Sequence, residues 1–181
     1  MRDMIGFSLI ELLVCIAILA IFTTVAVPSY SALVQRQEMT TAVNGMVHLL
    51  NLARMEAIKR QTFMTICPTA DNKNCSTDWN LPLMLFEDPN KDEHRTDNEQ
   101  LLRVLEPRSS TQWTANRNYV QYQASGLING TNASLVYCPQ SGEARYARRI
   151  IINIGGRVRL SADRDGDGIH EGSNGAALSC I

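Results

Sequence analysis

An almost unbroken apolar run from Phe7 to Val27 constrains this chain more than any other feature. At about 1.5 Å of rise per residue, a helix of this length can cross the hydrocarbon core of a bilayer. One carboxylate, Glu11, lies inside the run. A charge in a membrane span is costly and usually has a partner and a function. The sequence therefore predicts a membrane-spanning helix over residues 7–28 in which Glu11 is functional.

A cleaved secretory signal peptide is the alternative interpretation of this run. Such signals have a net positive start, a shorter apolar core and a small-x-small cleavage site. Here Arg2 is offset by Asp3, and Glu11 interrupts the core.

The segment GFSLIELL, which starts at Gly6, combines glycine, an aromatic residue and a glutamate in one register. This pattern resembles the class III signal of type IV pilins and type II secretion pseudopilins. The resemblance implies that residues 1–6 are a leader, and that a prepilin peptidase cleaves after Gly6 and N-methylates Phe7. It also implies that Glu11 pairs with the N-terminal amine of a neighbouring subunit, which offsets much of the cost of burying either charge.

Length and charge limit the rest of the chain, which has 181 residues and a net charge of −1. Beyond the apolar run about 150 residues remain, enough for one domain. Because the chain is near neutral, any nucleic-acid contact must be a local patch. The three histidines are scattered, and no nucleophile elbow, phosphate loop or zinc helix motif is present, so we do not expect an enzyme.

The sequence after Pro28 is amphipathic. Apolar residues recur at three- and four-residue steps, the period of a helix with one buried face: Leu33, Met39, Val43, Met46, Leu50, Ala53 and Ala57. Pro28 should kink such a helix without ending it. We therefore expect residues 29–61 to continue the membrane helix and to pack against a globular domain.

Short β-type runs separated by turn residues follow from Thr62 onward. They are TFMTIC, LPLMLFE, LLRVLE, YVQYQ, SLVYC, ARRIIINI and RVRLS. Gly155-Gly156, between the last two, predicts a hairpin. Residues 62–181 are therefore predicted to form a β-rich head, in which an antiparallel sheet packs on the helix in an α+β, pilin-like fold.

The middle of this head resembles the GspH/FimT family of minor pilins and pseudopilins. The family pattern has a tryptophan, a Phe-x-Asp-x-Asn strand end, an acidic turn and a Leu-Arg-Val strand. The matching residues are Trp79, Phe86, Asp88, Asn90, Leu102, Arg103 and Val104. One departure is Asn80-Leu81, where a glycine commonly follows the tryptophan. The resemblance covers the whole chain, densely in the first 30 residues and thinly in the sheet.

Four of the five cysteines lie beyond the membrane segment, an even number that suits two disulfides in an oxidising compartment. Four cysteines allow three connectivities. Cys67 and Cys75 bracket a short polar segment, which favours a local pair and leaves Cys138 to bind Cys180. Zinc is the competing interpretation, but there is no C-x-x-C. Cys15, inside the span, is most simply a small apolar residue.

The segment GGRVRLS is the candidate binding motif. Because side chains alternate along a strand, Arg157 and Arg159 should share one face, where they suit adjacent phosphates. Gly156-Arg157-Val158-Arg159 is similar to the G-R-x-R element of FimT-type minor pilins, which bind DNA during natural transformation. Three preceding arginines add positive charge: Arg145, Arg148 and Arg149. The alternative is a solvated strand whose arginines guard a sheet edge.

The segment DRDGDGIHEGSN resembles the first half of a calcium loop. Its acidic residues on alternate positions and the glycine after them are Asp163, Asp165, Asp167 and Gly168. Glu171 fits the ninth position of such a loop, whereas Asn174 stands where the bidentate glutamate should be. The alternatives are a calcium ion, as the sole cofactor, and an acidic turn that limits binding by the arginines.

The resemblance implies a minor pilin that captures double-stranded DNA without sequence preference during uptake. The alternative is a structural minor pilin or type II secretion pseudopilin that primes or caps a filament. Expected partners are other minor and major pilins, prepilin peptidase, the inner membrane and, in the first case, DNA. The expected location is the inner membrane, with one pass and the head in the periplasm, before assembly into a pilus.

Overall fold

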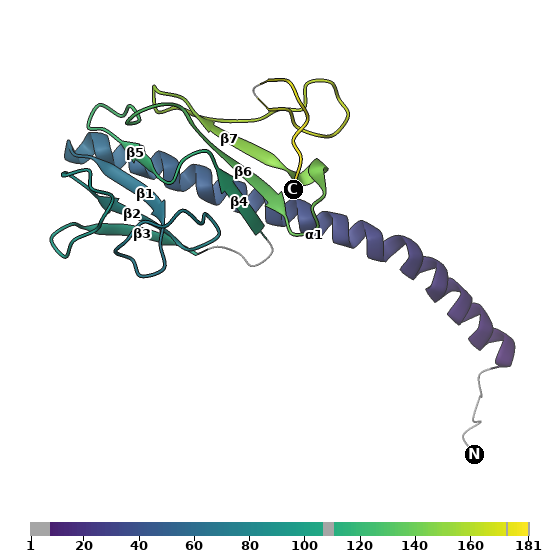
Figure 1. Cartoon of the computed structure of the whole chain (residues 1–181). Coiled ribbons are helices and arrows are strands. Elements are labelled where there is room, and N and C mark those ends of the chain that lie inside the picture. The colour runs from purple at the N-terminus through teal and green to yellow at the C-terminus, as the bar shows by residue number, and fades with distance from the viewer. Residues whose placement is uncertain (1–7, 107–110, 173, 181) are drawn as a thin grey trace, which may run out of the picture. The chain divides into compact units, whose positions relative to one another are not determined.

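One long helix, α1 (Leu9–Arg60), dominates the N-terminal part of the structure, a computed structural model that describes residues 8–106, 111–172 and 174–180 (Figure 1). The helix includes Pro28 without interruption. The predicted continuous helix over the apolar run and the amphipathic segment is therefore confirmed. Gly6 and Phe7 lie outside the described residues. Contacts divide the chain into an N-terminal unit, residues 1–37, and a head unit, residues 38–181.

The N-terminal unit consists of the apolar half of α1. Its most apolar 18-residue window has a mean hydropathy of 2.7, so by length and composition it can cross a membrane. Glu11 is exposed here, and its backbone N–H donates to Ser8 Oγ at 3.3 Å. Leu33, which we predicted on the buried face, is 52% exposed. That prediction is wrong because Leu33 belongs to this unit of exposed apolar side chains.

The head unit is built around the second half of α1. The buried residues of this half recur every three or four positions: Met39, Val43, Met46, Leu49, Leu50, Ala53 and Ala57. They form one core with buried strand residues such as Ile66, Leu85 and Ile150. Full burial of a large apolar side chain stabilises a fold by about 1.5–3 kcal/mol, so this helix face holds the head together.

In the described part of the chain, the strands form two antiparallel sheets of four strands, in the orders β3-β2-β1-β5 and β4-β6-β7-β8. The single sheet that we predicted is therefore divided into two, both contributing to the core around α1. The strands are β1 (Met64–Pro68), β2 (Leu83–Glu87), β3 (Leu101–Leu105), β4 (Thr111–Ala115), β5 (Val120–Tyr122), β6 (Ala133–Pro139), β7 (Arg148–Ile152) and β8 (Val158–Leu160). A 3-10 turn, η1 (Ala144–Tyr146), precedes β7.

Strand β4 has no counterpart among the predicted strands. Its sequence, TQWTA, has one large apolar residue, Trp113, which gives a weak strand signal. Pairing with β6 places Trp113 opposite Tyr137, and their rings meet edge to face with centroids 5.4 Å apart. This tertiary pairing, more than local propensity, makes the strand.

Two disulfides cross-link the described part of the head. Cys67 and Cys75 close a loop after β1, with Cα atoms 5.5 Å apart. Cys138, in β6, joins Cys180 near the C-terminus, with Cα atoms 5.7 Å apart. This is the connectivity that the cysteine spacing favoured.

Candidate functional site

The hairpin of β7 and β8 presents the G-R-x-R motif. The two strands pair antiparallel, with Ile151 opposite Arg159, and β8 lies at an edge of its sheet. Arg157 and Arg159 are exposed, whereas Val158 packs against the core. The alternation predicted from the sequence is therefore present, with one exposed arginine, Arg157, just before β8 and the other, Arg159, within it.

The turn of this hairpin is fixed to the head by α1. Gly156 has φ +75°, and a Cβ there would lie 2.0 Å from the carbonyl oxygen of Gly126. The Arg54 guanidinium donates to the carbonyls of Gly126, at 3.0 Å, and Gly155, at 3.1 Å. Asn153 Oδ1 accepts the backbone N–H of Arg157 at 3.0 Å. Gly156 therefore allows a close backbone approach and positions the arginines that follow.

Arg54 and Asn153 are positioning residues that the sequence analysis did not identify. Arg54 follows the buried Ala53 on the helix, and its guanidinium is partly buried. A charged residue beside the apolar face of an amphipathic helix is a weak signal, because such side chains often reach solvent along their stems. The two targets of its hydrogen bonds, Gly126 and Gly155, lie 72 and 101 residues further along the chain.

Arg145 and Arg148 lie at the opposite end of β7 from the turn. Arg145 pairs with Glu143 at 3.0 Å, and its guanidinium carbon is 5.9 Å from the Tyr146 ring centroid. Arg148 donates to the carbonyls of Arg145, at 2.8 Å, and Ala147, at 2.7 Å. The structure therefore separates these two arginines from Arg157 by the length of a strand.

Arg149 shares a sheet face with Arg159 but is covered by the C-terminal segment. The alternation along β7 puts Arg149 and Ile151 on the face opposite the buried Ile150, and Ile151 is the partner of Arg159. Arg149 is half-buried and lines a hollow with Gly172, Asn174 and residues 176–179, and a Cβ on Gly172 would lie 3.0 Å from its Nη1. Arg148 is half-buried as well, whereas Arg145, Arg157 and Arg159 are exposed.

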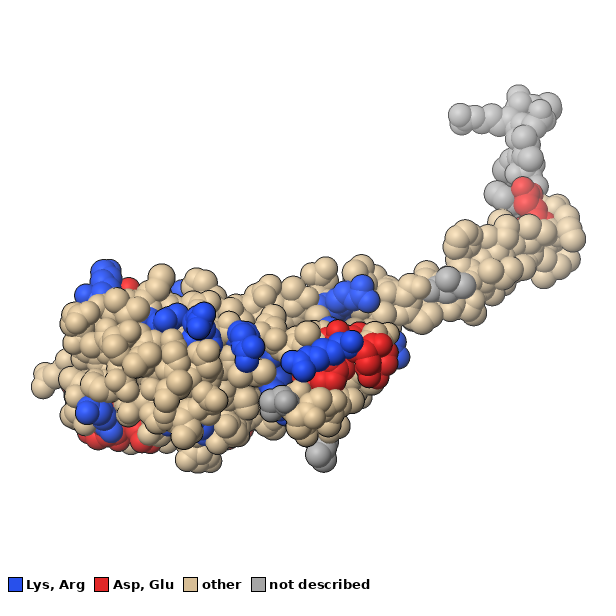
Figure 2. Space-filling model, turned by 90° about the horizontal axis from the view of Figure 1, so that it is seen from above, with Lys and Arg blue, Asp and Glu red and all other residues tan. Residues whose placement is uncertain are grey.

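Lysine and arginine side chains lie at intervals across the face of the head that Figure 2 shows, with a large group of acidic side chains at one end and a smaller group at the other. The basic residues form a spaced row, not a single cluster. Of the predicted residues, Arg157 and Arg159 follow the turn, and Arg145 and Arg148 lie at the far end of β7.

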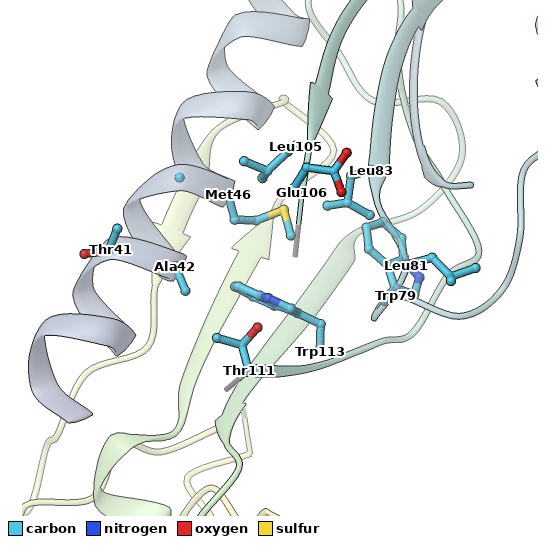
Figure 3. Close-up of a pocket in the computed structure, with 11 residues that line it drawn as sticks. Thr41, Ala42, Met46, Trp79, Leu81, Leu83, Leu105, Glu106, Thr111 and Trp113 are labelled. Carbon is cyan, nitrogen blue, oxygen red and sulfur yellow. The ribbon is translucent and has the colours of Figure 1, made fainter. Parts of the chain in front are cut away.

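An apolar hollow of about 220 Å³ lies between α1 and both sheets (Figure 3). Trp79 and Trp113 line it together with Met46 and Leu83. Trp79 Nε1 donates to the Arg117 carbonyl at 2.8 Å, and Asn80 Oδ1 accepts the Trp113 N–H at 2.8 Å. Asn80, the departure from the family pattern, thus ties this loop to β4. The lining is mostly aliphatic and aromatic, which suits packing more than chemistry.

Four carboxylates gather in the loop after β8. Oxygen atoms of Asp163, Asp165, Asp167 and Glu171 all lie within 4.8 Å of one another. The ring of His170, beside them, is 3.1 Å from Ser161 Oγ. Burial lowers the pKa of His170, and the charge of Arg148 adds to that effect.

A second acidic group, Asp88, Asp92 and Glu99, did not stand out in the sequence. Asp88 is fully buried, and its Oδ2 accepts hydrogen bonds from Thr65, at 2.7 Å, and Gln121, at 2.9 Å. Its Oδ1 accepts the backbone N–H of Asp92 at 3.2 Å. Asp88 therefore joins β2 to β1 and β5 and has a structural role.

Comparison with known families decides what this head is. The family described as type II transport protein GspH matches residues 42–156, more than half of the 181 residues. The chain belongs to the GspH family. The prokaryotic N-terminal methylation motif matches residues 1–27 of this GspH-family protein, which agrees with the resemblance of its first segment to prepilin signals.

Solved structures show the same fold. The type IV minor pilin FimU of Pseudomonas aeruginosa is 19% identical with a TM-score of 0.57, covering 81% of this chain and 97% of FimU. The minor pseudopilin EpsH of the Vibrio cholerae type II secretion system is 15% identical with a TM-score of 0.51, covering 73% of this chain and 99% of EpsH. No curated protein sequence matches the chain. The protein is therefore a GspH-family protein with an N-terminal methylation motif, an apolar N-terminal helix and the fold of these solved structures.

Proposed function

We propose that this GspH-family protein is a minor type IV pilin that binds extracellular DNA during uptake in natural transformation. The observation that carries the proposal is the pair of exposed arginines Arg157, just before the edge strand β8, and Arg159, within it, beside a turn that Arg54 fixes. Their sequence, G-R-V-R, is also the one that resembles the DNA-binding element of FimT-type minor pilins.

The binding follows from the chemistry of the guanidinium group. Each arginine presents parallel N–H donors that fit phosphate oxygens bidentately. Contacts to phosphates carry no base information, so binding is indifferent to sequence and arises largely from counterion release. Arg145 and Arg148 lie a strand length away, where they extend the binding surface along the duplex. Arg149 contributes charge from beneath the C-terminal segment.

The test is a salt titration of DNA binding by the full chain in detergent micelles. Replacing Arg157 and Arg159 together by Gln removes two charges and keeps side-chain polarity. We expect affinity for a random-sequence duplex to fall on the order of tenfold or more. The log–log salt slope should shrink by about 0.9 for each phosphate that the variant no longer neutralises. Lysine at both positions should restore part of the affinity, because lysine restores the positive charge but cannot bind a phosphate bidentately as a guanidinium does.

A matched control removes the same charge elsewhere. The variant with Lys59→Gln and Arg103→Gln loses two exposed cations, one on α1 and one on β3. It should bind DNA like the unaltered chain. Wild-type binding by the folded Arg157→Gln, Arg159→Gln variant would contradict the proposal, as would an equal decrease in the control.

A structural minor pilin or type II secretion pseudopilin is the second candidate. The family match and the fold of FimU and EpsH favour it, because those proteins are a minor pilin and a minor pseudopilin by name. In this case the head docks onto other minor or major pilins and the arginines bind no DNA. The absence of any DNA retardation by the unaltered chain would favour this candidate.

The N-terminal segment serves either candidate in the same way. We propose a leader over residues 1–6, cleavage after Gly6 by prepilin peptidase, methylation of Phe7, and an inner-membrane span over residues 7–28 with the head in the periplasm. Glu11 then pairs with the N-terminal amine of a neighbouring subunit. Glu11→Leu should be processed normally yet be absent from sheared filaments. Incorporation at the wild-type level would disprove the pairing.

A further inference from the structure

The loop from Asp163 to Glu171 concentrates negative charge that the proposed function does not use. Three of its carboxylates, on Asp163, Asp165 and Asp167, are exposed, and the fourth, on Glu171, is buried. One oxygen from each lies within 4.8 Å of the others. At that spacing four carboxylates repel one another unless a cation lies between them.

Glu171 is the buried member of this cluster, and its two carboxylate oxygens have different surroundings. The residue is only 6% exposed. One carboxylate oxygen, Oε2, accepts the backbone N–H of Arg164 at 2.7 Å. The other, Oε1, is buried and accepts no hydrogen bond from any residue that the structure describes. A buried carboxylate oxygen without a partner is costly, and such oxygens in native proteins usually meet an ion or water.

Backbone contacts at the base of the loop hold Glu171 in place. The backbone N–H of Glu171 donates to the Ala162 carbonyl at 3.1 Å, and Glu171 forms a β-bridge with Ala177. The chain that follows is tied to β6 by the disulfide of Cys138 and Cys180. The buried carboxylate is therefore anchored beside the exposed acidic part of the loop.

From these contacts we infer that the loop binds one calcium ion. Glu171 and the three aspartates supply the carboxylate oxygens, and the ion satisfies Glu171 Oε1. All four donors are oxygen, which suits a hard cation and not zinc. Calcium accepts six to eight oxygens in variable geometry, whereas magnesium requires a near-ideal octahedron that a loop of this kind does not impose.

The other acidic group shows the contrast. Both oxygens of the buried Asp88 accept hydrogen bonds, from Thr65, Gln121 and the Asp92 backbone. That carboxylate is satisfied by protein, whereas Glu171 has one oxygen left over. Burial of an acidic side chain is thus common to both groups, and the unpartnered oxygen distinguishes the loop after β8.

The test is calorimetric titration of CaCl₂ into the full chain in detergent micelles after chelator treatment, with excess magnesium and potassium present. We expect saturable binding of one ion with a Kd on the order of 0.1–1 mM, the range of extracellular calcium modules. Asp165→Asn keeps the exposed side chain and its hydrogen-bonding capacity but removes a charged ligand. It should weaken binding on the order of tenfold or more. Glu171→Gln should do the same while its amide oxygen still accepts the Arg164 N–H.

A matched control is Asp92→Asn, which removes one exposed carboxylate from the other acidic group. It should leave calcium binding unchanged. Circular dichroism checks the fold of each variant, and if Glu171→Gln fails to fold, Asp165→Asn and Asp167→Asn decide. Three results would overturn the calcium site. They are the absence of saturable heat from the unaltered chain, binding of magnesium as tight as that of calcium, and wild-type affinity in the folded Asp165→Asn variant.

Discussion

Arg54 Nη2, on helix α1, lies 3.1 Å from the carbonyl oxygen of Gly155, 101 residues further along the chain. The same guanidinium also binds the carbonyl of Gly126 at 3.0 Å. One side chain on the helix thus fixes the turn that presents Arg157 and Arg159. The helix positions the candidate DNA-binding hairpin as well as forming the core.

Replacing Arg54 by Met should loosen that turn. Methionine fills similar space but leaves two partly buried carbonyls without a donor, which costs about 1–3 kcal/mol. Urea unfolding of the full chain in micelles measures the free energy of unfolding. Lys59→Met, an exposed change on the same helix, is the control and should change that free energy by less than about 0.5 kcal/mol. An unaltered unfolding free energy for Arg54→Met would show that the turn holds itself.

Gly156→Ala should be far more damaging than Gly142→Ala. Both glycines have positive φ, +75° and +72°, so either alanine adopts a strained backbone at about 1–2 kcal/mol. At Gly156 the new Cβ would also lie 2.0 Å from the Gly126 carbonyl oxygen, whereas at Gly142 nothing lies within 4 Å. The unfolding free energy of Gly142→Ala measures the backbone strain alone, and the further loss in Gly156→Ala measures the steric clash with Gly126. Similar destabilisation in both would show that the turn can move away from Gly126.

The two disulfides should contribute unequally to stability. Cys138 and Cys180 are 42 residues apart and Cys67 and Cys75 are 8 apart. In the chain-entropy model the longer loop corresponds to about 4 kcal/mol and the shorter to about 2.5 kcal/mol. Paired Cys→Ser variants, unfolded in urea, measure the difference. A larger destabilisation from opening the short loop would mean that its local interactions outweigh loop entropy.

Low pH should reduce the contribution to folding stability of the loop between Cys67 and Cys75. Backbone and side-chain N–H groups of Asn74, with the backbone N–H of Lys73, bind the carboxylate of Asp71 and hold its pKa well below the usual range. Because the folded-state pKa is depressed, this stability is present above the unfolded pKa near 4 and is lost as pH falls below it.

The Asp71 effect can be measured by urea unfolding at intervals from neutral pH down to about pH 2. Asp71→Asn should lose stability at neutral pH and show a shallower acid dependence than the unaltered chain. Asp97→Asn, which removes an exposed carboxylate 3.3 Å from Lys73, is the control and should leave the acid slope nearly unchanged. Identical slopes for Asp71→Asn and the unaltered chain would contradict this assignment.

The helix and most strands could be predicted because their signals are local. The apolar run and the three- and four-residue spacing from Met39 to Ala57 specify a helix through interactions within a turn or two. The division into two sheets could not be predicted, because β5 pairs with β1 and β4 pairs with β6, and strand order depends on pairings distant in sequence. Trp113 alone could not identify β4 for the same reason.

The candidate sites divide in the same way. The sequence by itself determined the alternation that exposes Arg157 and Arg159, and the order of carboxylates from Asp163 to Glu171, because both depend on spacing along a few residues. Only the tertiary structure decided that the C-terminal segment covers Arg149 and that Glu171 is buried with one oxygen unpartnered. Burial depends on which distant segments pack together, and in this protein the helix face, the β-pairings and the Cys138–Cys180 disulfide bring those segments into contact.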